Sequence, residues 1–256
     1  MNIALFGGTF DPIHRGHLEV ARAAARRFHL REIWFIPADI PPHKQKMPIT
    51  SYFHRYSMVA LALAEEHDFL PSLLEAPEPE AHLERRPSYS IDTVRNVKKG
   101  LRRGDRLYFL IGMDAFRDIA KWYQAEELLQ ECEFIIAARP GYSLDDVAES
   151  LPEKLRPTRK ELKAAGLEAA LQQRGVSLQL LPETHEDVSA TQIRTAMRRG
   201  KDLSELVPDT VAEYIRKEGL YLPPAAQRPK TSATKTVRRA PKRPAARRSI
   251  KARGAN

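Results

Sequence analysis

Residues 3–17, which read IALFGGTFDPIHRGH, hold the clearest structural signal in the chain. The first four of these residues are apolar and run directly into Gly7 and Gly8. A buried strand followed by glycines, a polar turn and a helix is typical of a parallel α/β sheet. Glycine lets the backbone approach a ligand closely, and the unpaired N–H groups at the start of the next helix attract an anion. The stretch therefore predicts a phosphate site after the first strand.

Short β-prone runs alternate with amphipathic stretches along the rest of the chain. We expect strands at residues 3–6, 33–36, 107–111 and 134–137, with weaker patterns at 69–74 and 176–181. We expect a first helix that has His14 and His17 in its first turn and apolar positions at Leu18, Ala21, Ala25 and Phe28. We expect further helices at residues 56–66, 91–101, 190–199 and 208–217, and residues 145–175 are polar and helix-prone. The last helix has Pro208 in its first turn and Gly219 just past its end. Proline is common at the start of helices and glycine is common just after their end. The alternation predicts a Rossmann-like, doubly wound parallel sheet followed by C-terminal helices.

Charge divides the chain into two parts. Lys and Arg number 42 against 33 Asp and Glu, which gives a net charge of +9. Residues 223–256 hold 11 of the basic residues and no acidic one, so residues 1–222 hold 31 against 33 and carry −2. We expect a folded domain at 1–222 and a disordered basic tail at 223–256, because the tail has little to bury. Such a tail would bind RNA, DNA or anionic surfaces weakly and salt-dependently, or would be a solvated appendage without a partner.

The cysteine count and the distribution of apolar residues bear on disulfides, thiolate zinc sites and membrane-spanning segments. Cys132 is the only cysteine, so an intrachain disulfide and a thiolate zinc site are both excluded. The sequence has no apolar run near the roughly 20 residues that cross a bilayer. Its apolar start lacks a basic lead-in and is interrupted by Gly7 and Gly8. We therefore expect a cytoplasmic protein, whose oligomeric state the sequence does not indicate.

His14 and His17 lie three residues apart in the first turn of the first expected helix, so their side chains share a face. Taken alone, His-x-x-His is typical of surface histidines, and a zinc site would need a third ligand. The dinucleotide fingerprint G-x-G-x-x-G and the loop G-x-x-x-x-G-K-[ST] are both absent. Since Gly16 leaves room beside the two rings, the pattern favours a phosphate site made of imidazoles and backbone amides.

Residues 188–194, which read VSATQIR, predict a second anion site at a helix start. Ser189 is a candidate N-cap, and Thr191 and Arg194 share one face of the first turns. A guanidinium suits phosphate. The alternative is an ordinary capped surface helix with an exposed arginine.

These two segments resemble the motifs of the nucleotidyltransferase superfamily. Its H-x-G-H is met by His14, Gly16 and His17, and its I-S-S-T-x-I-R is similar to residues 188–194. Further blocks resemble the bacterial nicotinate-nucleotide adenylyltransferase family, namely residues 37–44 (PADIPPHK), 88–93 (SYSIDT), 111–114 with 122–123, 139–141 (RPG) and 206–221. The chain departs from the family pattern at Ala190 (usually Ser), at Ser90 (usually Thr) and at Arg85-Arg86-Pro87, where a glycine is common.

The resemblance implies adenylyl transfer from ATP to nicotinate mononucleotide, which gives nicotinate adenine dinucleotide and pyrophosphate without a covalent intermediate. His17 would contact the α-phosphate with His14 beside it, while Lys44 and Arg194 would hold the triphosphate and the leaving pyrophosphate. Mg²⁺ would bridge phosphate oxygens without a protein side chain as ligand, and Asp11 would first be a turn residue.

The resemblance also implies the binding residues. Those for ATP are Gly8, Thr9, Phe10, His14, His17, Gly112, Asp114, Ser189, Thr191 and Arg194. Those for the acceptor are Lys44, Ser90, Trp122 and Tyr123. Asp114 would reach a ribose unless it caps a helix, and Trp122 would stack on the pyridine ring unless it belongs to the core. The amide of Ser90 or of a neighbour would receive the ring carboxylate.

Two classes of alternative remain. A nucleotidyltransferase that makes dephospho-coenzyme A or a CDP-alcohol would not be expected to carry residues 88–93 and Trp122, and an aminoacyl-tRNA synthetase would need a K-M-S-K-S-like loop that is not seen. A nucleic-acid-binding protein would act through residues 223–256, so deletion of the tail separates it from an adenylyltransferase.

Overall fold

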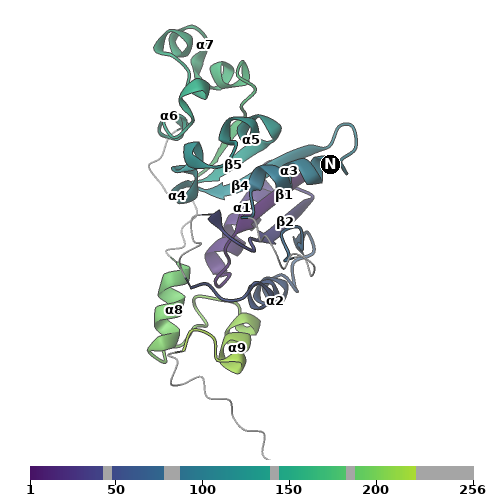
Figure 1. Ribbon diagram of the computed structural model, residues 1–256, viewed down its shortest axis with the longest axis vertical. Coiled ribbons are helices and arrows are strands. Elements are labelled where there is room, and N and C mark those ends of the chain that lie inside the picture. Colours follow the sequence, from purple (N-terminus) through teal and green to yellow (C-terminus); the bar gives the residue numbers. More distant parts are fainter. Residues whose placement is uncertain (43–47, 78–86, 139–143, 183–187, 223–256) are drawn as a thin grey trace, which may run out of the picture.

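The computed structural model describes residues 1–42, 48–77, 87–138, 144–182 and 188–222. Its centre is a six-stranded sheet in the order β3-β2-β1-β4-β5-β6, and each neighbouring pair is parallel (Figure 1). The strands are β1 (Asn2–Gly8), β2 (Glu32–Pro37), β3 (Phe69–Pro71), β4 (Arg106–Gly112), β5 (Glu133–Ala137) and β6 (Leu178–Leu181). This order is that of a Rossmann sheet, so the predicted fold class is confirmed.

Helices connect the strands and close the chain. They are α1 (Arg15–Phe28), α2 (Tyr52–Ala62), α3 (Ser90–Lys98), α4 (Met113–Phe116), α5 (Ala125–Glu131), α6 (Leu144–Ala148), α7 (Arg159–Gln172), α8 (Ala190–Arg198) and α9 (Asp209–Glu218), with 3-10 turns η2 (Ile119–Lys121) and η3 (Glu153–Leu155). Within the described ranges, no helix is long and apolar enough to cross a membrane.

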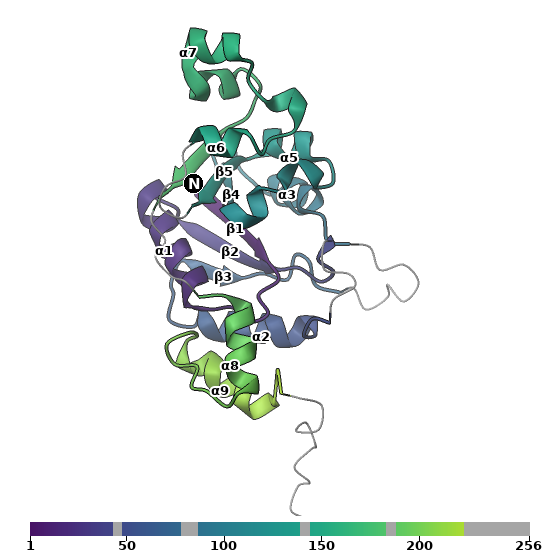
Figure 2. The same ribbon diagram turned by 90° about the vertical axis from the view of Figure 1, so that its left-hand side faces the viewer.

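The two faces of the sheet are covered by different helices, and each face has its own apolar core. On one face, α1, α2, α8 and α9 contribute the buried residues Ala21, Met58, Ile193 and Ile215. On the other face, α3, α4 and α5 contribute Val94, Phe116 and Leu128. Figure 2 shows α1 and α3 on opposite sides of the strands. Burial on both faces explains why the strands are continuous apolar runs rather than alternating ones.

Helix ends follow local sequence signals, with one shift. Gly219 caps α9 in the left-handed conformation (φ 63°), as predicted from the sequence. By contrast, α2 begins at Tyr52, four residues before the expected start at residue 56. Its first turn contains the polar pair His54 and Arg55, which interrupts the apolar periodicity used to place the helix.

The sheet order places a crevice between β1 and β4. The chain leaves β1 for α1 on one face and leaves β4 for α4 on the other, so the carboxyl ends of these adjacent strands are not bridged by a connection. Ligands of open α/β sheets bind at such a switch point. The glycine-rich segment after β1 therefore lies where the fold expects a ligand.

Candidate active site

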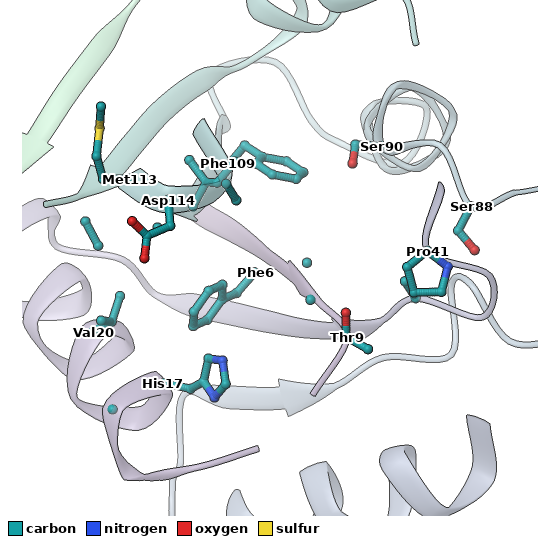
Figure 3. Close-up of a pocket in the computed structure, with 18 of the residues that line it drawn as sticks. Phe6, Thr9, His17, Val20, Pro41, Ser88, Ser90, Phe109, Met113 and Asp114 are labelled. Carbon is teal, nitrogen blue, oxygen red and sulfur yellow. The ribbon is translucent and has the colours of Figure 1, made fainter. Parts of the chain in front are cut away.

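A cavity of about 420 Å³ opens at the carboxyl ends of β1 and β4. Among the residues that line it are Gly7, Gly8 and Thr9 after β1, Gly112 and Asp114 after β4, and His14, Gly16 and His17 at the start of α1. Figure 3 shows His17 and Asp114 near one end of this cavity and Ser88, Ser90 and Pro41 near the other. The first predicted phosphate motif and the predicted segment around Asp114 are thus brought together.

The two histidines form a stacked pair at the beginning of α1. Their ring centroids are 3.6 Å apart with an interplanar angle of 30°. His14 is the N-cap of α1 with an extended backbone, and its main-chain N–H donates to Nδ1 of His17 at 3.2 Å. A neutral imidazole that accepts at Nδ1 carries its proton on Nε2. His17 is therefore arranged as an Nε2–H donor.

His14 is held neutral by its surroundings. The residue is 8% exposed, and burial lowers the pKa of His14 to about 4. Its Nδ1 atom is buried without a hydrogen-bond partner among the described residues. His14 as a residue lines the cavity, so this unpaired atom lies close to the space that a ligand would occupy.

Phe10 packs against His17 and does not itself line the cavity. Its backbone is left-handed (φ 47°), and its buried ring lies edge-on to His17 with centroids 5.0 Å apart. The same ring approaches Gly8 so closely that a Cβ there would lie 3.0 Å from it. Gly8, Thr9 and Phe10 were expected to surround the ATP phosphates with their backbone amides. Gly8 and Thr9 line the cavity, and we call their backbone the cradle, whereas Phe10 does not line the cavity.

The turn behind the cradle is fixed by Asp11. Its Oδ1 accepts a hydrogen bond from the Tyr221 hydroxyl at 2.7 Å, and its Oδ2 accepts one from the Thr50 N–H at 3.3 Å. The Asp11-Pro12 peptide bond is cis. Both carboxylate oxygens are thus engaged within the protein, in agreement with the expected turn role of Asp11.

The second predicted motif lies beside the cavity rather than inside it. Ser189 caps α8 by accepting from the Gln192 N–H at 3.2 Å, so the predicted N-cap is confirmed. Arg194 donates to Thr191 Oγ1 at 3.0 Å and to the Asp11 carbonyl at 2.8 Å. Of this segment only Val188 is among the residues that line the cavity. The guanidinium therefore joins α8 to the loop that follows β1.

A second cavity of about 420 Å³ adjoins the first. The two share the lining residues Pro42, Ser88, Ser90, Asp114, Ala115 and Trp122. One wall is a stack of Tyr89 on Tyr123, with ring centroids 4.4 Å apart and an interplanar angle of 30°. Tyr123 is 51% exposed. The predicted acceptor residues Ser90, Trp122 and Tyr123 thus lie around one hollow.

These contacts bear on the alternative roles that were expected for Trp122 and Asp114. Trp122 lines both cavities and also packs edge-on against Phe109 at 6.2 Å, so it belongs to the apolar core and still borders the cavities. Asp114 is the second residue of α4, whose N-cap is Gly112. The capping alternative for Asp114 is therefore wrong, and its carboxylate is left to line both cavities.

Sequence reasoning missed two charged residues near the cavity. Glu75 lines the first cavity, accepts a hydrogen bond from Thr93 Oγ1 at 2.6 Å, and has its pKa raised by burial. Arg55 in α2 is fully buried and donates to main-chain carbonyls. A charged residue within an apolar helix face was the available signal for Arg55, whereas nothing in the sequence singles out Glu75.

Some predicted residues lie outside the described ranges. These are Lys44, Arg85, Arg86, the segment 139–141 and the predicted basic tail 223–256. In the part of the chain that the structure describes, no group of three His, Cys, Asp or Glu residues is placed to hold a metal ion.

Comparison with known proteins identifies the family. A model of the cytidylyltransferase-like family matches residues 5–196. The chain belongs to this family. Among its cytidylyltransferase-like relatives, the "Probable nicotinate-nucleotide adenylyltransferase" of Moorella thermoacetica is 36% identical over 222 residues, or 86% of this chain and 92% of that protein. The nicotinate-nucleotide adenylyltransferase of Bacillus subtilis is 36% identical over 220 residues, or 86% of this chain and 97% of that protein.

Solved structures support the cytidylyltransferase-like fold. The Plasmodium falciparum nicotinic acid mononucleotide adenylyltransferase, complexed with NaAD, has a TM-score of 0.60 and 20% identity. The match covers 86% of this chain and 97% of that one. At this identity the likeness is one of fold.

Proposed function

We propose that this chain transfers the adenylyl group of ATP to nicotinate mononucleotide and releases pyrophosphate. The observation that carries the proposal is a pair of adjoining cavities at the β1/β4 switch point, one beside His14 and His17 and the other beside the Tyr89–Tyr123 stack. Two nucleotides bound in such cavities would meet at the shared lining. The names of the relatives from Bacillus subtilis and Moorella thermoacetica agree with this activity.

The reaction needs alignment more than acid–base chemistry. An oxygen of the mononucleotide 5′-phosphate forms a bond to the α-phosphorus of ATP, and the bond from that phosphorus to the β-bridging oxygen breaks. A phosphate monoester has a second pKa near about 6 and is mostly dianionic at neutral pH. It needs no general base, so the protein's task is to hold two anions in line and to stabilise the charge that moves to pyrophosphate.

His17 is the proposed α-phosphate donor. Its Nδ1 is engaged by the His14 N–H, which directs the ring proton to Nε2. Neutral His14 lies stacked beside it, and its buried Nδ1 lacks a partner in the described chain. The backbone around Gly8 and Thr9 completes a cradle whose donors are fixed before ATP binds.

Cationic side chains are proposed to hold the β- and γ-phosphates. Arg194 is anchored on the Asp11 carbonyl and on Thr191. From there it would bring positive charge to the edge of the cradle, beside the α8 start at Ser189. Lys44 would approach from the segment after β2. Arginine is suited to such a role because its planar fork binds phosphate oxygens in pairs.

The acceptor's pyridine ring is proposed to bind in the second cavity. Trp122 and the exposed Tyr123 ring offer aromatic surfaces, and the start of α3 at Ser90 offers backbone N–H groups to the ring carboxylate. Such a helix start favours nicotinate, which is charged, over the neutral nicotinamide. Asp114, shared by both cavities, would accept a hydrogen bond from a ribose hydroxyl.

Mg²⁺ is proposed to arrive with ATP rather than to reside in the protein. The described residues form no three-ligand cluster, and Mg²⁺ commonly retains water and binds through substrate phosphates. When bound, the ion would neutralise phosphate charge.

A pyrophosphate-release assay with the full chain tests the proposal. ATP would be paired in separate reactions with nicotinate mononucleotide, nicotinamide mononucleotide or phosphopantetheine. We expect the fastest release with nicotinate mononucleotide, together with a dinucleotide product detected by mass. Preference for phosphopantetheine, or release without dinucleotide, would overturn the proposal.

A further inference from the structure

Arg55 is a fully buried charged residue in the first turn of α2. Its Nη1 donates to the Thr9 carbonyl at 2.8 Å, its Nε donates to the Thr50 carbonyl at 2.8 Å, and its Nη2 donates to the Asp39 carbonyl at 3.3 Å. All three acceptors are main-chain oxygens. The side chain therefore fixes the course of backbone segments that lie far apart in sequence.

Those segments form two sides of the proposed site. Thr9 belongs to the cradle after β1 and lines the first cavity (Figure 3). Asp39 and Thr50 flank the segment after β2, in which Pro41 and Pro42 also line the first cavity. Arg55 thus ties the cradle to both ends of the neighbouring wall.

The contact with Thr9 has a geometric consequence for the cradle. In a trans peptide, the C=O and the following N–H point in opposite directions. Because the Thr9 carbonyl points at Arg55, the N–H of Phe10 points away from Arg55. The left-handed backbone of Phe10 turns the chain at this position, so the hydrogen bond from Arg55 fixes the peptide at which the cradle ends.

A buried guanidinium is a costly means of support. Burial lowers the pKa of Arg55, while the Asp11 and Asp39 carboxylates oppose that effect. Well-packed apolar residues often support a fold as well as a buried charge does. A rigid fork with donors in three directions, however, orients three carbonyls at once, which neither an apolar side chain nor a lysine does.

We propose that Arg55 is a positioning residue for adenylyl transfer, because its hydrogen bond to the Thr9 carbonyl fixes the cradle of Gly8 and Thr9 and because it holds the wall of Pro41 and Pro42 against that cradle. The inference rests on the proposed function. It concerns the alignment of ATP and not its chemistry, since Arg55 does not line either cavity.

The main test compares Arg55→Lys and Arg55→Ala with matched changes at Arg174. Arg174 also uses its guanidinium to hold a carbonyl and a carboxylate, those of Ala170 and Glu161. It follows α7, which Figure 2 shows at the end of the molecule opposite α8 and α9. Circular dichroism and thermal melting report folding for all four variants, and steady-state kinetics report kcat and the KM of each substrate.

We expect Arg55→Lys to fold and to lose about 100-fold in kcat, as for a misplacement of about 1 Å in a reacting group. Added guanidinium should restore part of the kcat of Arg55→Ala, whereas ammonium should not, because only guanidinium reproduces the fork. Arg174→Lys should lose thermal stability without losing kcat.

The outcomes are distinguishable. A wild-type chain that makes no dinucleotide refutes the proposed function itself. Suppose that the wild type is active and that Arg55→Lys keeps the wild-type kcat but has a lower melting temperature, as Arg174→Lys does. That result would overturn the inference, because it would show that Arg55 only supports the fold. If neither Arg55 variant folds, nuclear magnetic resonance of the wild-type chain decides: ATP should shift the signals of the Gly8 and Thr9 amides and slow their hydrogen exchange. No response of those amides to saturating ATP would overturn the inference.

Discussion

The main-chain N–H of His14 donates to Nδ1 of His17 across 3.2 Å, so the first histidine of the pair fixes the ring proton of the second on Nε2. The same contact ties the N-cap of α1 to its third helical residue. Substitutions at position 17 can therefore separate the role of Nδ1 in the helix start from the role of Nε2 in the cavity.

The pair His17→Asn and His17→Gln makes that separation. Asparagine keeps an acceptor near Nδ1 but lacks the reach of Nε2, whereas glutamine keeps the reach. We expect both variants to fold and His17→Asn to lose about 100-fold or more in kcat, as when one fixed oxyanion donor is removed. His17→Gln should retain more activity. Equal turnover of His17→Asn and wild type would exclude Nε2 from the reaction.

Burial of His14 predicts a stability that depends on pH. The folded pKa of about 4 lies below the ordinary histidine pKa of 6.5, so the unfolded chain binds a proton at this position more readily than the folded chain does. The contribution of neutral His14 is complete above about pH 6.5 and is lost as the pH falls towards 4, and its full size is about 3 kcal/mol. Urea unfolding at several pH values measures this loss. His14→Gln should show a shallower decline between pH 6.5 and 4, and parallel curves for the two proteins would contradict the assignment.

The hydrogen bond from Tyr221 to Asp11 is expected to stabilise the turn before the histidines. Tyr221→Phe removes the donor and leaves a buried carboxylate oxygen, which should cost about 1–3 kcal/mol of unfolding free energy. It should also raise the KM for ATP, because the Asp11 carbonyl anchors Arg194. Tyr214→Phe is the control, since within the described ranges its hydroxyl is hydrogen-bonded to His54 at 2.8 Å, between α2 and α9, and not to the turn at Asp11. An equal rise in the KM for ATP in both variants would show that the effect does not depend on the hydrogen bond between Tyr221 and Asp11.

The contact between Gly8 and Phe10 makes position 8 intolerant of a side chain. In Gly8→Ala the new Cβ would lie 3.0 Å from the Phe10 ring, which is itself packed against His17. Displacement of that ring should lower the free energy of unfolding by about 1–3 kcal/mol. It should also lower the turnover, because the ring packs against His17. Gly100→Ala is the matched change, because its Cβ would meet only the Val97 carbonyl at 3.6 Å. Unfolding curves and turnover of both variants check this, and a fully active Gly8→Ala would show that the ring position is unimportant.

Deletion of residues 223–256 tests the proposed division of the chain. We expect residues 1–222 to fold and to keep the turnover of the full chain, because every residue proposed for the site precedes the tail. Any weak binding of RNA or of anionic vesicles should be lost, and in the full chain it should fall steeply with salt, since 11 basic residues leave with the tail. Turnover that disappears with the tail would place the activity there and favour the nucleic-acid alternative.

Local sequence signals predicted the six strands and most of the helices, but α4 and α5 were not among the expected helices. Buried apolar runs located the strands, Ser189 and Gly219 marked helix ends, and the glycines after the first strand located the cavity. These features depend on residues a few positions apart, for which periodicity and capping rules apply.

Contacts over long sequence distances were not predictable from these rules. Arg55 reaches Thr9 across 46 positions, and Arg194 reaches Asp11 across 183. The sequence shows that each arginine is present, but only the packing of α2 and α8 beside the sheet determines what its guanidinium meets. The stacking of Tyr89 on Tyr123 has the same origin, because α3 and the turn after η2 approach each other only in the folded chain.

The tie between Asp11 and Tyr221 spans 210 positions, and it bears on how the protein is made. A ribosome synthesises the turn at Asp11 among the first residues and its partner Tyr221 only 210 positions later. A nascent or prematurely terminated chain therefore carries the histidine pair next to a turn that lacks this hydrogen bond until residue 221 has left the exit tunnel.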